Sequence, residues 1–193
     1  MEFGADAPGE IGLPRATEFS DLRYQVRRCL RKFGEAKRKW KTIPLRMVQR
    51  DELEKLIDRW AESAVARFRA RGWPMVVDPQ VTLVEPNKAV ALASSGYPGQ
   101  VVCVDGVASA LWIAESTSDT VIGLYCLLAD TRYYNLAYLN VALALASFSG
   151  SGFQSILLGG SEIESLFRFK RITSRDTAST VVLRRVRDLV RGQ

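Results

Sequence analysis

The chain has 193 residues, of which 47% are hydrophobic and 25% charged, proportions typical of one globular domain that buries a core. It contains no histidine, which excludes a Ser-His-Asp triad, a histidine-activated cysteine and any zinc site built on histidine. Its three cysteines are an odd number without metal-like spacing, so we expect buried free thiols, no metal site and a reducing compartment.

The amino-terminal residues are charged, contain glycine and proline, and lack the apolar core of a signal peptide. Nowhere does an apolar run of the sequence reach the length that spans a bilayer. We therefore expect a cytoplasmic protein without stable membrane insertion. Residues 1–16 are predicted to be a flexible leader, and residues 17–193 a single domain.

Residues 20–42 predict an amphipathic, strongly basic helix that Ser20 or Asp21 caps and that Pro44 ends near Thr42. Its apolar stripe consists of Leu22, Val26, Cys29, Leu30 and Phe33. This stretch and the residues just after it carry ten basic side chains: Arg23, Arg27, Arg28, Arg31, Lys32, Lys37, Arg38, Lys39, Lys41 and Arg46. Because only Glu35 opposes them, we expect a polyanionic partner, with nucleic acid favoured over a membrane.

A second helix is predicted to begin at Asp51, where Asp51 and Glu54 have the spacing of a capping box. Its buried face consists of Leu53, Leu56, Ile57, Trp60, Ala64 and Phe68. Gly72 and Pro74 end this helix.

Strands dominate the middle of the chain. Short strands are expected at 81–84 and 88–94, and Asp105-Gly106 predicts a hairpin between 100–104 and 107–115. Residues 120–130 are almost wholly apolar, which is typical of a central strand. Trp112, which alternates within its strand, is predicted to be core.

Helices and strands alternate after residue 130. Asn135 can cap a buried helix over 136–148, and a strand at 155–158 leads to a helix that starts at Glu162 behind a Ser161–Glu164 capping box. Residues 177–192 fit either a strand followed by a helix or one helix. The order predicts an α+β fold with helices packed on a mostly antiparallel central sheet.

This order resembles that of the GNAT N-acyltransferases. The resemblance covers residues 101–172 and rests on the hairpin "VVCVDGVASALWIAE", the strand "TVIGLYCLLAD" and the segment "YYNLAYLNVALALASFSGSGFQSILLGGSEIESLFRFKRI". The last segment is most similar to the members that use aminoacyl-tRNA, namely Fem-type aminoacyltransferases and the catalytic domain of lysyl-phosphatidylglycerol synthases. In these proteins a strand ending in Leu-Gly-Gly and a helix ending in Phe-Lys follow a helix, as in this chain.

Two features depart from the members that use acetyl-CoA. Those enzymes carry an Arg/Gln-x-x-Gly-x-Gly/Ala loop whose backbone amides approach the CoA pyrophosphate, whereas the corresponding "DTRYYNLAYLN" has no glycine. They also carry a tyrosine that protonates the CoA thiolate, and Phe167 stands at that place.

The resemblance implies a site where strand ends meet helix starts. Lys170 is the candidate donor to the transferred carbonyl, and Glu162 the candidate base, with Asp130, Glu115 and the ribose hydroxyl of the substrate as rivals. The remaining residues predicted to bind substrate are Gly159, Gly160, Ser161, Tyr133, Tyr134, Asn135 and Asp130. Each glycine can equally serve a tight turn, and one of the two tyrosines is expected to belong to the core, whereas the other can stack on the terminal adenine of tRNA.

The predicted function is aminoacyl transfer from tRNA to an amine of a small molecule or peptide, with no cofactor beyond the tRNA co-substrate. The residues predicted to hold tRNA are Arg23, Arg27, Arg28, Arg31, Lys32, Lys37, Arg38, Lys39 and Lys41. One alternative is an acyl-CoA-dependent N-acyltransferase with a degenerate pyrophosphate loop. Another is a non-catalytic RNA-binding module on the same fold. The amino acid, the acceptor and the oligomeric state stay open.

Overall fold

The computed structural model describes residues 2–3, 19–70, 95–148, 151 and 155–157, and the structural statements below concern these residues. The helices are α1 (Ser20–Glu35), α2 (Arg50–Ala70) and α5 (Leu136–Phe148), with a short 3₁₀ turn η2 (Leu45–Met47). The strands are β1 (Glu2–Phe3), β2 (Trp40–Pro44), β3 (Gly99–Val104), β4 (Val107–Ser118), β5 (Val121–Ala129) and β6 (Ser155–Leu157).

The described strands form one sheet whose spatial order is their order in the chain, β1 to β6. Every neighbouring pair from β1 to β5 is antiparallel, and β6 returns parallel to β5 after α5. This confirms the predicted α+β class and the mostly antiparallel sheet. Within the segment predicted as a leader, Glu2 and Phe3 pair with Lys41 and Trp40 of β2.

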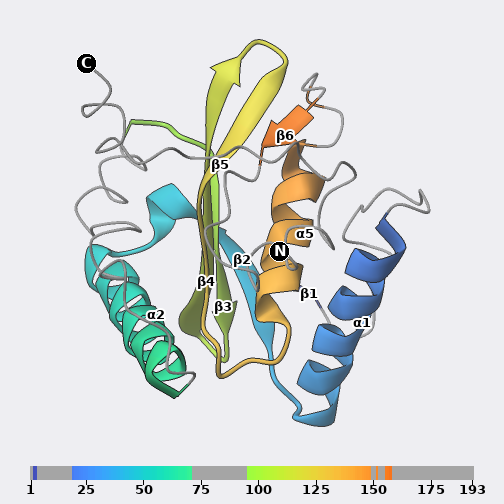
Figure 1. Cartoon of the computed structure of the whole chain (residues 1–193), viewed down its shortest axis with the longest axis vertical. Coiled ribbons are helices and arrows are strands. Elements are labelled where there is room, and N and C mark those ends of the chain that lie inside the picture. Colours follow the sequence, from blue (N-terminus) through green and yellow to red (C-terminus); the bar gives the residue numbers. More distant parts are fainter. Residues whose placement is uncertain (1, 4–18, 71–94, 149–150, 152–154, 158–193) are drawn as a thin grey trace, which may run out of the picture.

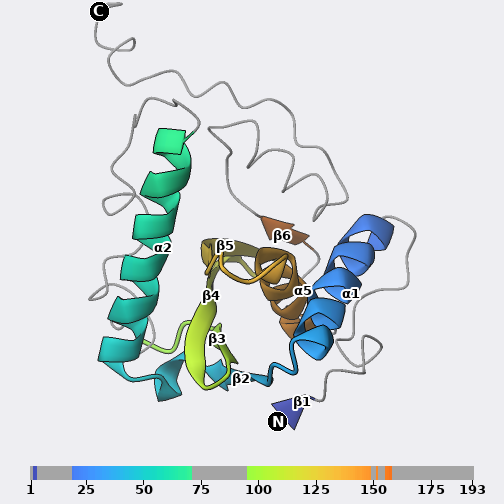
Figure 2. The ribbon, with the colours of Figure 1, turned by 90° about the horizontal axis from the view of Figure 1, so that it is seen from below.

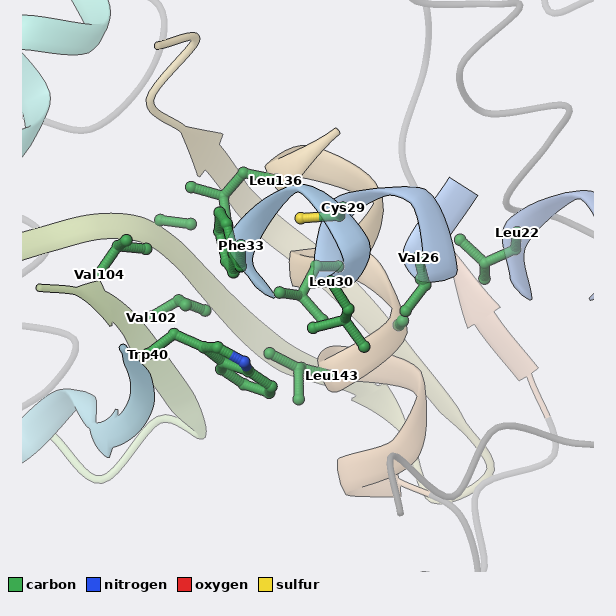
Figure 3. Close-up of a cluster of buried hydrophobic side chains, with 13 residues drawn as sticks. Leu22, Val26, Cys29, Leu30, Phe33, Trp40, Val102, Val104, Leu136 and Leu143 are labelled. Carbon is green, nitrogen blue, oxygen red and sulfur yellow. The ribbon is translucent and has the colours of Figure 1, made fainter. Parts of the chain in front are cut away.

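Helices cover both faces of the sheet. Figures 1 and 2 show α2 on one face and α1 with α5 on the other. Side chains of β3 alternate between the two layers, because Val102 and Val104 pack with α1 and α5, whereas Val101 and Cys103 pack under α2. Both layers are buried hydrophobic clusters, and Figure 3 shows the one in which the stripe of α1 meets Trp40 and Leu136.

The first helix is shorter than predicted, because α1 ends at Glu35 and not near Thr42. Lys37 adopts a left-handed φ of 51°, and its N–H donates to the Gly34 carbonyl while the N–H of Arg38 donates to the Phe33 carbonyl. These two bonds form a Schellman motif, which ends a helix. The chain then enters β2, whose Trp40 is buried in the core on the α1 side.

Two predicted helix caps are also wrong. α1 begins at Ser20 itself, and the preceding Phe19 offers no side-chain cap. α2 begins at Arg50, one residue before the predicted start. The carboxylates of Asp51 and Glu54 form ion pairs with Lys55 and Arg50 instead of a capping box.

The hairpin and the central strand agree with the sequence. Asp105 and Gly106 have φ values of 51° and 81°, as a two-residue hairpin turn requires, and they join β3 to β4. β5 has neighbours on both sides. Trp112 is buried, as predicted. The three cysteines are free and buried, and burial raises the pKa of Cys29 to about 12.

Several predictions lie outside the described residues. These are the strands at 81–84 and 88–94, the stop at Gly72 and Pro74, the capping box at Ser161 and the elements after it. The strand predicted at 155–158 is described as β6 up to Leu157. The side chains of Ala64 and Phe68 are likewise outside the description, whereas Leu53, Leu56 and Ile57 are buried as predicted.

Candidate functional site

The segment that joins β5 to α5, residues 130–135, holds four of the predicted site residues. Its first member, Asp130, has only 2% of its surface exposed. Its carboxylate accepts hydrogen bonds from Arg132 at 2.6 and 3.0 Å and lies 3.5 Å from Nε of Arg59 on α2. The segment therefore begins with a buried carboxylate held by two guanidinium groups.

Arg59 links this segment to the other face of the sheet. Its Nη2 donates to the carbonyl of Ala108 at 2.6 Å, and the next residue, Ser109, is the extra residue of a β-bulge in β4. The Ser109 carbonyl accepts the N–H of Asp130 at 2.8 Å. Two neighbouring carbonyls at the bulge thus accept hydrogen bonds from α2 and from the residue that follows β5.

The electrostatics of Asp130 argue against the role of general base. Burial opposes its ionisation, but hydrogen bonds from Arg132 and the charges of Arg132 and Arg59 outweigh burial and lower the pKa of Asp130. A carboxylate with a lowered pKa is a weak proton acceptor near neutral pH. Asp130 is better suited to shaping the segment that follows it.

Two backbone amides of this segment, and the first amide of α5, donate to acceptors within it. The N–H of Arg132 donates to Oδ1 of Asp130, and the N–H of Tyr133 donates to the Asp130 carbonyl. The N–H of Leu136 donates to the Tyr133 carbonyl, and the Asn135 carbonyl accepts the first bonds of α5. The amides of Arg132, Tyr133 and Leu136 are therefore not free to bind an anion at the start of α5.

Asn135 occupies the predicted cap position, but its side chain does not bond the helix. Its φ is 60°, and its Nδ2 donates to Oε1 of Gln25 on α1 at 2.7 Å. This contact joins the start of α5 to α1.

The two tyrosines differ in burial, and one of them packs against the core, as predicted. Tyr133 is partly buried and packs edge-on against Phe33, with ring centroids 6.1 Å apart. Tyr134 is 44% exposed. The guanidinium of Arg28 lies 5.0 Å from the Tyr134 ring centroid and 5.6 Å from that of Tyr24, and the guanidinium of Arg38 lies 5.2 Å from that of Tyr133. The predicted substrate residues and the predicted tRNA residues therefore meet along α1 and the start of α5.

The basic residues do not form one uniform surface. Arg31 and Lys32 pair with Glu35, and Arg38 pairs with Asp105 of the hairpin turn at 2.8 Å. Because Trp40 faces α1 and residues alternate along β2, Lys41 lies on the opposite face, which Ile43 shares beneath α2. The prediction that Lys41 continues the basic helix is therefore wrong. Lys37, Arg38 and Lys39 lie in the turn after α1.

A second bulge interrupts β5 halfway along the strand. Ile113 pairs with Cys126 and the next residue, Ala114, pairs with Leu124, so Tyr125 is the extra residue. The described part of β6 ends opposite Gly123, two residues before this bulge. A bulged residue stands outside the regular ladder, and bulges are frequent beside active sites.

Other candidates are not brought together by the described residues. Lys170, Glu162, Gly159, Gly160 and Ser161 lie outside them. Glu115 is exposed on β4, with the Tyr97 hydroxyl 3.4 Å from its Oε1. Among the described residues there is no metal-binding group of carboxylates and thiols, and no described helix is both long and apolar enough to cross a membrane.

Antiparallel strands in chain order, a helix after β5 and a parallel return through β6 give the chain a GNAT-like fold. No protein-family model matches the sequence, and no curated protein does. A conserved protein of unknown function from Bacteroides thetaiotaomicron has a similar structure, with a TM-score of 0.58 and 13% identity over 86% of this chain and 52% of its own.

Two further solved structures are less similar. One is the C-terminal domain assigned to a lysylphosphatidylglycerol synthetase of Agrobacterium fabrum, with a TM-score of 0.46 and 14% identity over 82% of this chain and 46% of its own. The other is an aminoglycoside acetyltransferase from an uncultured soil sample, with a TM-score of 0.46 and 15% identity over 76% of this chain and 93% of its own. The chain thus spans about half the length of the first two proteins.

Sequence reasoning missed three parts of this site. It did not include Arg59, because the sequence of a helix does not show which distant residue an arginine on it will contact. It did not include the bulge at Tyr125, since an apolar strand gives no sign of where its register shifts. It did not include Tyr24, although its spacing of four residues from Arg28 on a helix could have indicated their contact.

Proposed function

We propose that this chain is an N-acyltransferase that takes an aminoacyl group from tRNA and transfers it to an amine of a small molecule or peptide. The observation that carries the choice of donor is segment 130–135, which has no glycine and whose Arg132 and Tyr133 amides donate to Asp130. The GNAT-like fold supports acyl transfer, and this segment supports the choice of tRNA over CoA.

CoA fits this segment poorly. Enzymes of the resembling family that use acetyl-CoA offer free backbone amides to its pyrophosphate at this point, whereas here Asp130 and Tyr133 accept the amides of Arg132, Tyr133 and Leu136. The guanidinium of Arg132 already donates hydrogen bonds to the carboxylate of Asp130. We therefore derive no step through CoA.

An aminoacyl-tRNA needs a different surface. Its ester carries no pyrophosphate, and its binding depends on contacts to phosphates and on stacking of its unpaired end. Arg27 is exposed and forms no ion pair with a described residue, and Arg28 meets Tyr134 at the start of α5. A basic, aromatic surface beside the start of α5 supports a nucleic-acid donor.

The transfer exchanges one bond for another. The neutral amine nitrogen attacks the ester carbonyl carbon, a C–N bond forms, and the C–O bond to the terminal ribose of tRNA breaks. One proton leaves the amine nitrogen and one is gained by the ribose oxygen, so the products are an amide and uncharged tRNA. Because negative charge develops on the carbonyl oxygen, the site needs a donor aimed at it.

Two groups are proposed for that oxygen. The bulge at Tyr125 removes its backbone groups from the regular ladder halfway along β5, which supports a carbonyl site there. Lys170 remains the predicted side-chain donor. Glu162, Glu115 and the ribose hydroxyl remain rivals as the base, since the lowered pKa of Asp130 disfavours it.

The test is transfer from charged tRNA. The full chain is incubated with tRNA pools that carry labelled amino acids and with a panel of amines, and the labelled amide is captured. We expect label to leave tRNA faster with the wild type than with Lys170→Ala. Release of label no faster than in the absence of protein, with every amine, would overturn the proposal. Equal rates for the wild type and Lys170→Ala would overturn the role of Lys170, and transfer from acetyl-CoA but not from charged tRNA would establish the CoA alternative.

A further inference from the structure

Tyr24, Arg28 and Tyr134 form a small cluster at the surface, in which both tyrosines are exposed. The guanidinium of Arg28 lies 5.6 Å from the Tyr24 ring centroid and 5.0 Å from the Tyr134 ring centroid. Tyr24 and Arg28 are one turn apart on α1, and Tyr134 comes from the segment before α5. The cluster therefore bridges two elements that are far apart in the chain, next to the hydrogen bond between Gln25 and Asn135.

The charge of Arg28 is not neutralised within the described residues. Arg31 and Lys32 have Glu35, Arg38 has Asp105, and Arg132 has Asp130, but no carboxylate pairs with Arg28. Its guanidinium carbon lies near two rings, and no described residue accepts a hydrogen bond from its N–H groups. Such a guanidinium is suited to a phosphate, which it can bind through two parallel hydrogen bonds.

The rings of the cluster are themselves exposed. Tyr24 is 55% and Tyr134 44% exposed, whereas the neighbouring Tyr133 packs against Phe33 at the core. A nucleobase can stack on an exposed tyrosine ring only if the base is unpaired, because the faces of paired bases are covered by their neighbours in the helix. The combination thus favours a single strand over a duplex.

We propose that Tyr24, Arg28 and Tyr134 bind single-stranded RNA, with a phosphate on the edge of the Arg28 guanidinium and an unpaired base on a tyrosine ring. This inference rests on the proposed function for the identity of the strand, which is the unpaired 3′ end of the donor tRNA. It adds the place at which that end is held, beside the start of α5.

Binding of a labelled single-stranded RNA that ends in CCA tests the site without any transfer. The full chain is titrated at low salt and fluorescence anisotropy is recorded for the wild type, Arg28→Lys and Tyr134→Leu. Arg28→Lys keeps the charge but loses the planar fork, so we expect affinity to fall about tenfold. Tyr134→Leu removes the stacking platform, and we expect a similar loss of about tenfold.

Matched controls separate the site from net charge and from folding. Arg50→Lys makes the same exchange on α2, across the sheet, and is expected to change affinity less than about twofold. Tyr134→Phe keeps the ring and is expected to bind as the wild type does. The melting temperatures of all variants are compared, and if a variant is unfolded, Tyr24→Leu is titrated in its place.

The outcomes distinguish this site from the proposed function. If folded Arg28→Lys and Tyr134→Leu bind the strand as tightly as the wild type, the site is wrong, even if transfer from charged tRNA is observed. If both variants lose affinity but the wild type transfers no amino acid, the site stands and the proposed function fails. Equal loss of affinity for a fully paired RNA would also overturn the stacking role of Tyr134.

Discussion

The two faces of the sheet carry basic side chains that are paired in different ways. On the α2 face, Arg50 and Lys55 each meet a carboxylate one turn away, and Arg59 reaches Asp130. On the α1 face, Arg27 and Arg28 have no described carboxylate, and Arg28 lies between two tyrosines. Charge that is balanced within the protein serves stability or solubility, whereas charge left unbalanced beside exposed rings is available to a partner.

The contrast concerns surface charge and not the buried layers. We therefore expect the buried side chains of both faces to contribute to stability, whereas only the α1 face should contribute to RNA binding. Phe33 on the α1 face and Leu56 on the α2 face are both almost completely buried. Phe33→Ala should lower the free energy of unfolding by about 3–5 kcal/mol, and Leu56→Ala by about 2–5 kcal/mol, because each leaves a cavity. Urea unfolding measures both losses, and a negligible loss for either variant would contradict the described packing.

Asp130 joins the two faces, and its replacement should have the next largest effect. Asp130→Asn leaves the partly buried Arg59 without a carboxylate, so we expect a loss of about 2–4 kcal/mol at pH 7. Because the pKa of Asp130 is lowered from its ordinary 3.8, its stabilisation is present above that pH and is lost as the pH falls through the lowered pKa. Urea unfolding should show that the wild type and Asp130→Asn differ less in free energy of unfolding near pH 3 than at pH 7. A difference that stays constant would refute the ion pair.

Salt dependence sharpens the contrast in charge. Replacing Arg27, Arg28 and Arg31 by Gln should weaken tRNA binding roughly tenfold or more and flatten its dependence on salt by about one to two units of slope. The matched control replaces Arg50 and Lys55 by Gln on α2, where we expect neither quantity to change. Binding isotherms at several salt concentrations measure both. Equal losses for the two sets would mean that net charge, and not the α1 surface, determines binding.

The smallest expected effect lies on α2. Arg50 and Glu54 form an exposed i,i+4 ion pair at 2.7 Å. Glu54→Gln should change the free energy of unfolding by less than about 0.5 kcal/mol, since such pairs are well solvated. A loss of more than about 1 kcal/mol in the free energy of unfolding would show that this pair stabilises α2 more than an exposed ion pair should.

Features encoded locally were predictable from the sequence. The Asp105-Gly106 turn, the apolar strand β5 and the buried helix α5 each follow from the residues within them. The boundary between α1 and β2 was not predictable, because basic residues continue past Gly34 without a change of pattern. The chain enters the sheet where Trp40 is buried against α1 and α5, and no pattern in the neighbouring residues indicates this burial.

The candidate site was predicted only in part for a related reason. Tyr133, Tyr134, Asn135 and the basic residues were identified separately, and their meeting depends on how α1 packs on α5. The contact of Arg59 with Asp130 joins residues 59 and 130, which are far apart in the sequence, and the bulge at Tyr125 depends on register with β4. Such features arise from tertiary pairing, which the spacing of residue types does not specify.

We propose that segment 130–135 and the surface of α1 favour an RNA donor over CoA. The most direct measurement is the melting temperature of the full chain with uncharged tRNA and, separately, with CoA, each at saturating concentration. A ligand at 100 times its Kd stabilises the folded state by about 2.7 kcal/mol, which raises the melting temperature by several degrees. We predict this rise with tRNA and none with CoA, and a rise with CoA but not with tRNA would contradict the account.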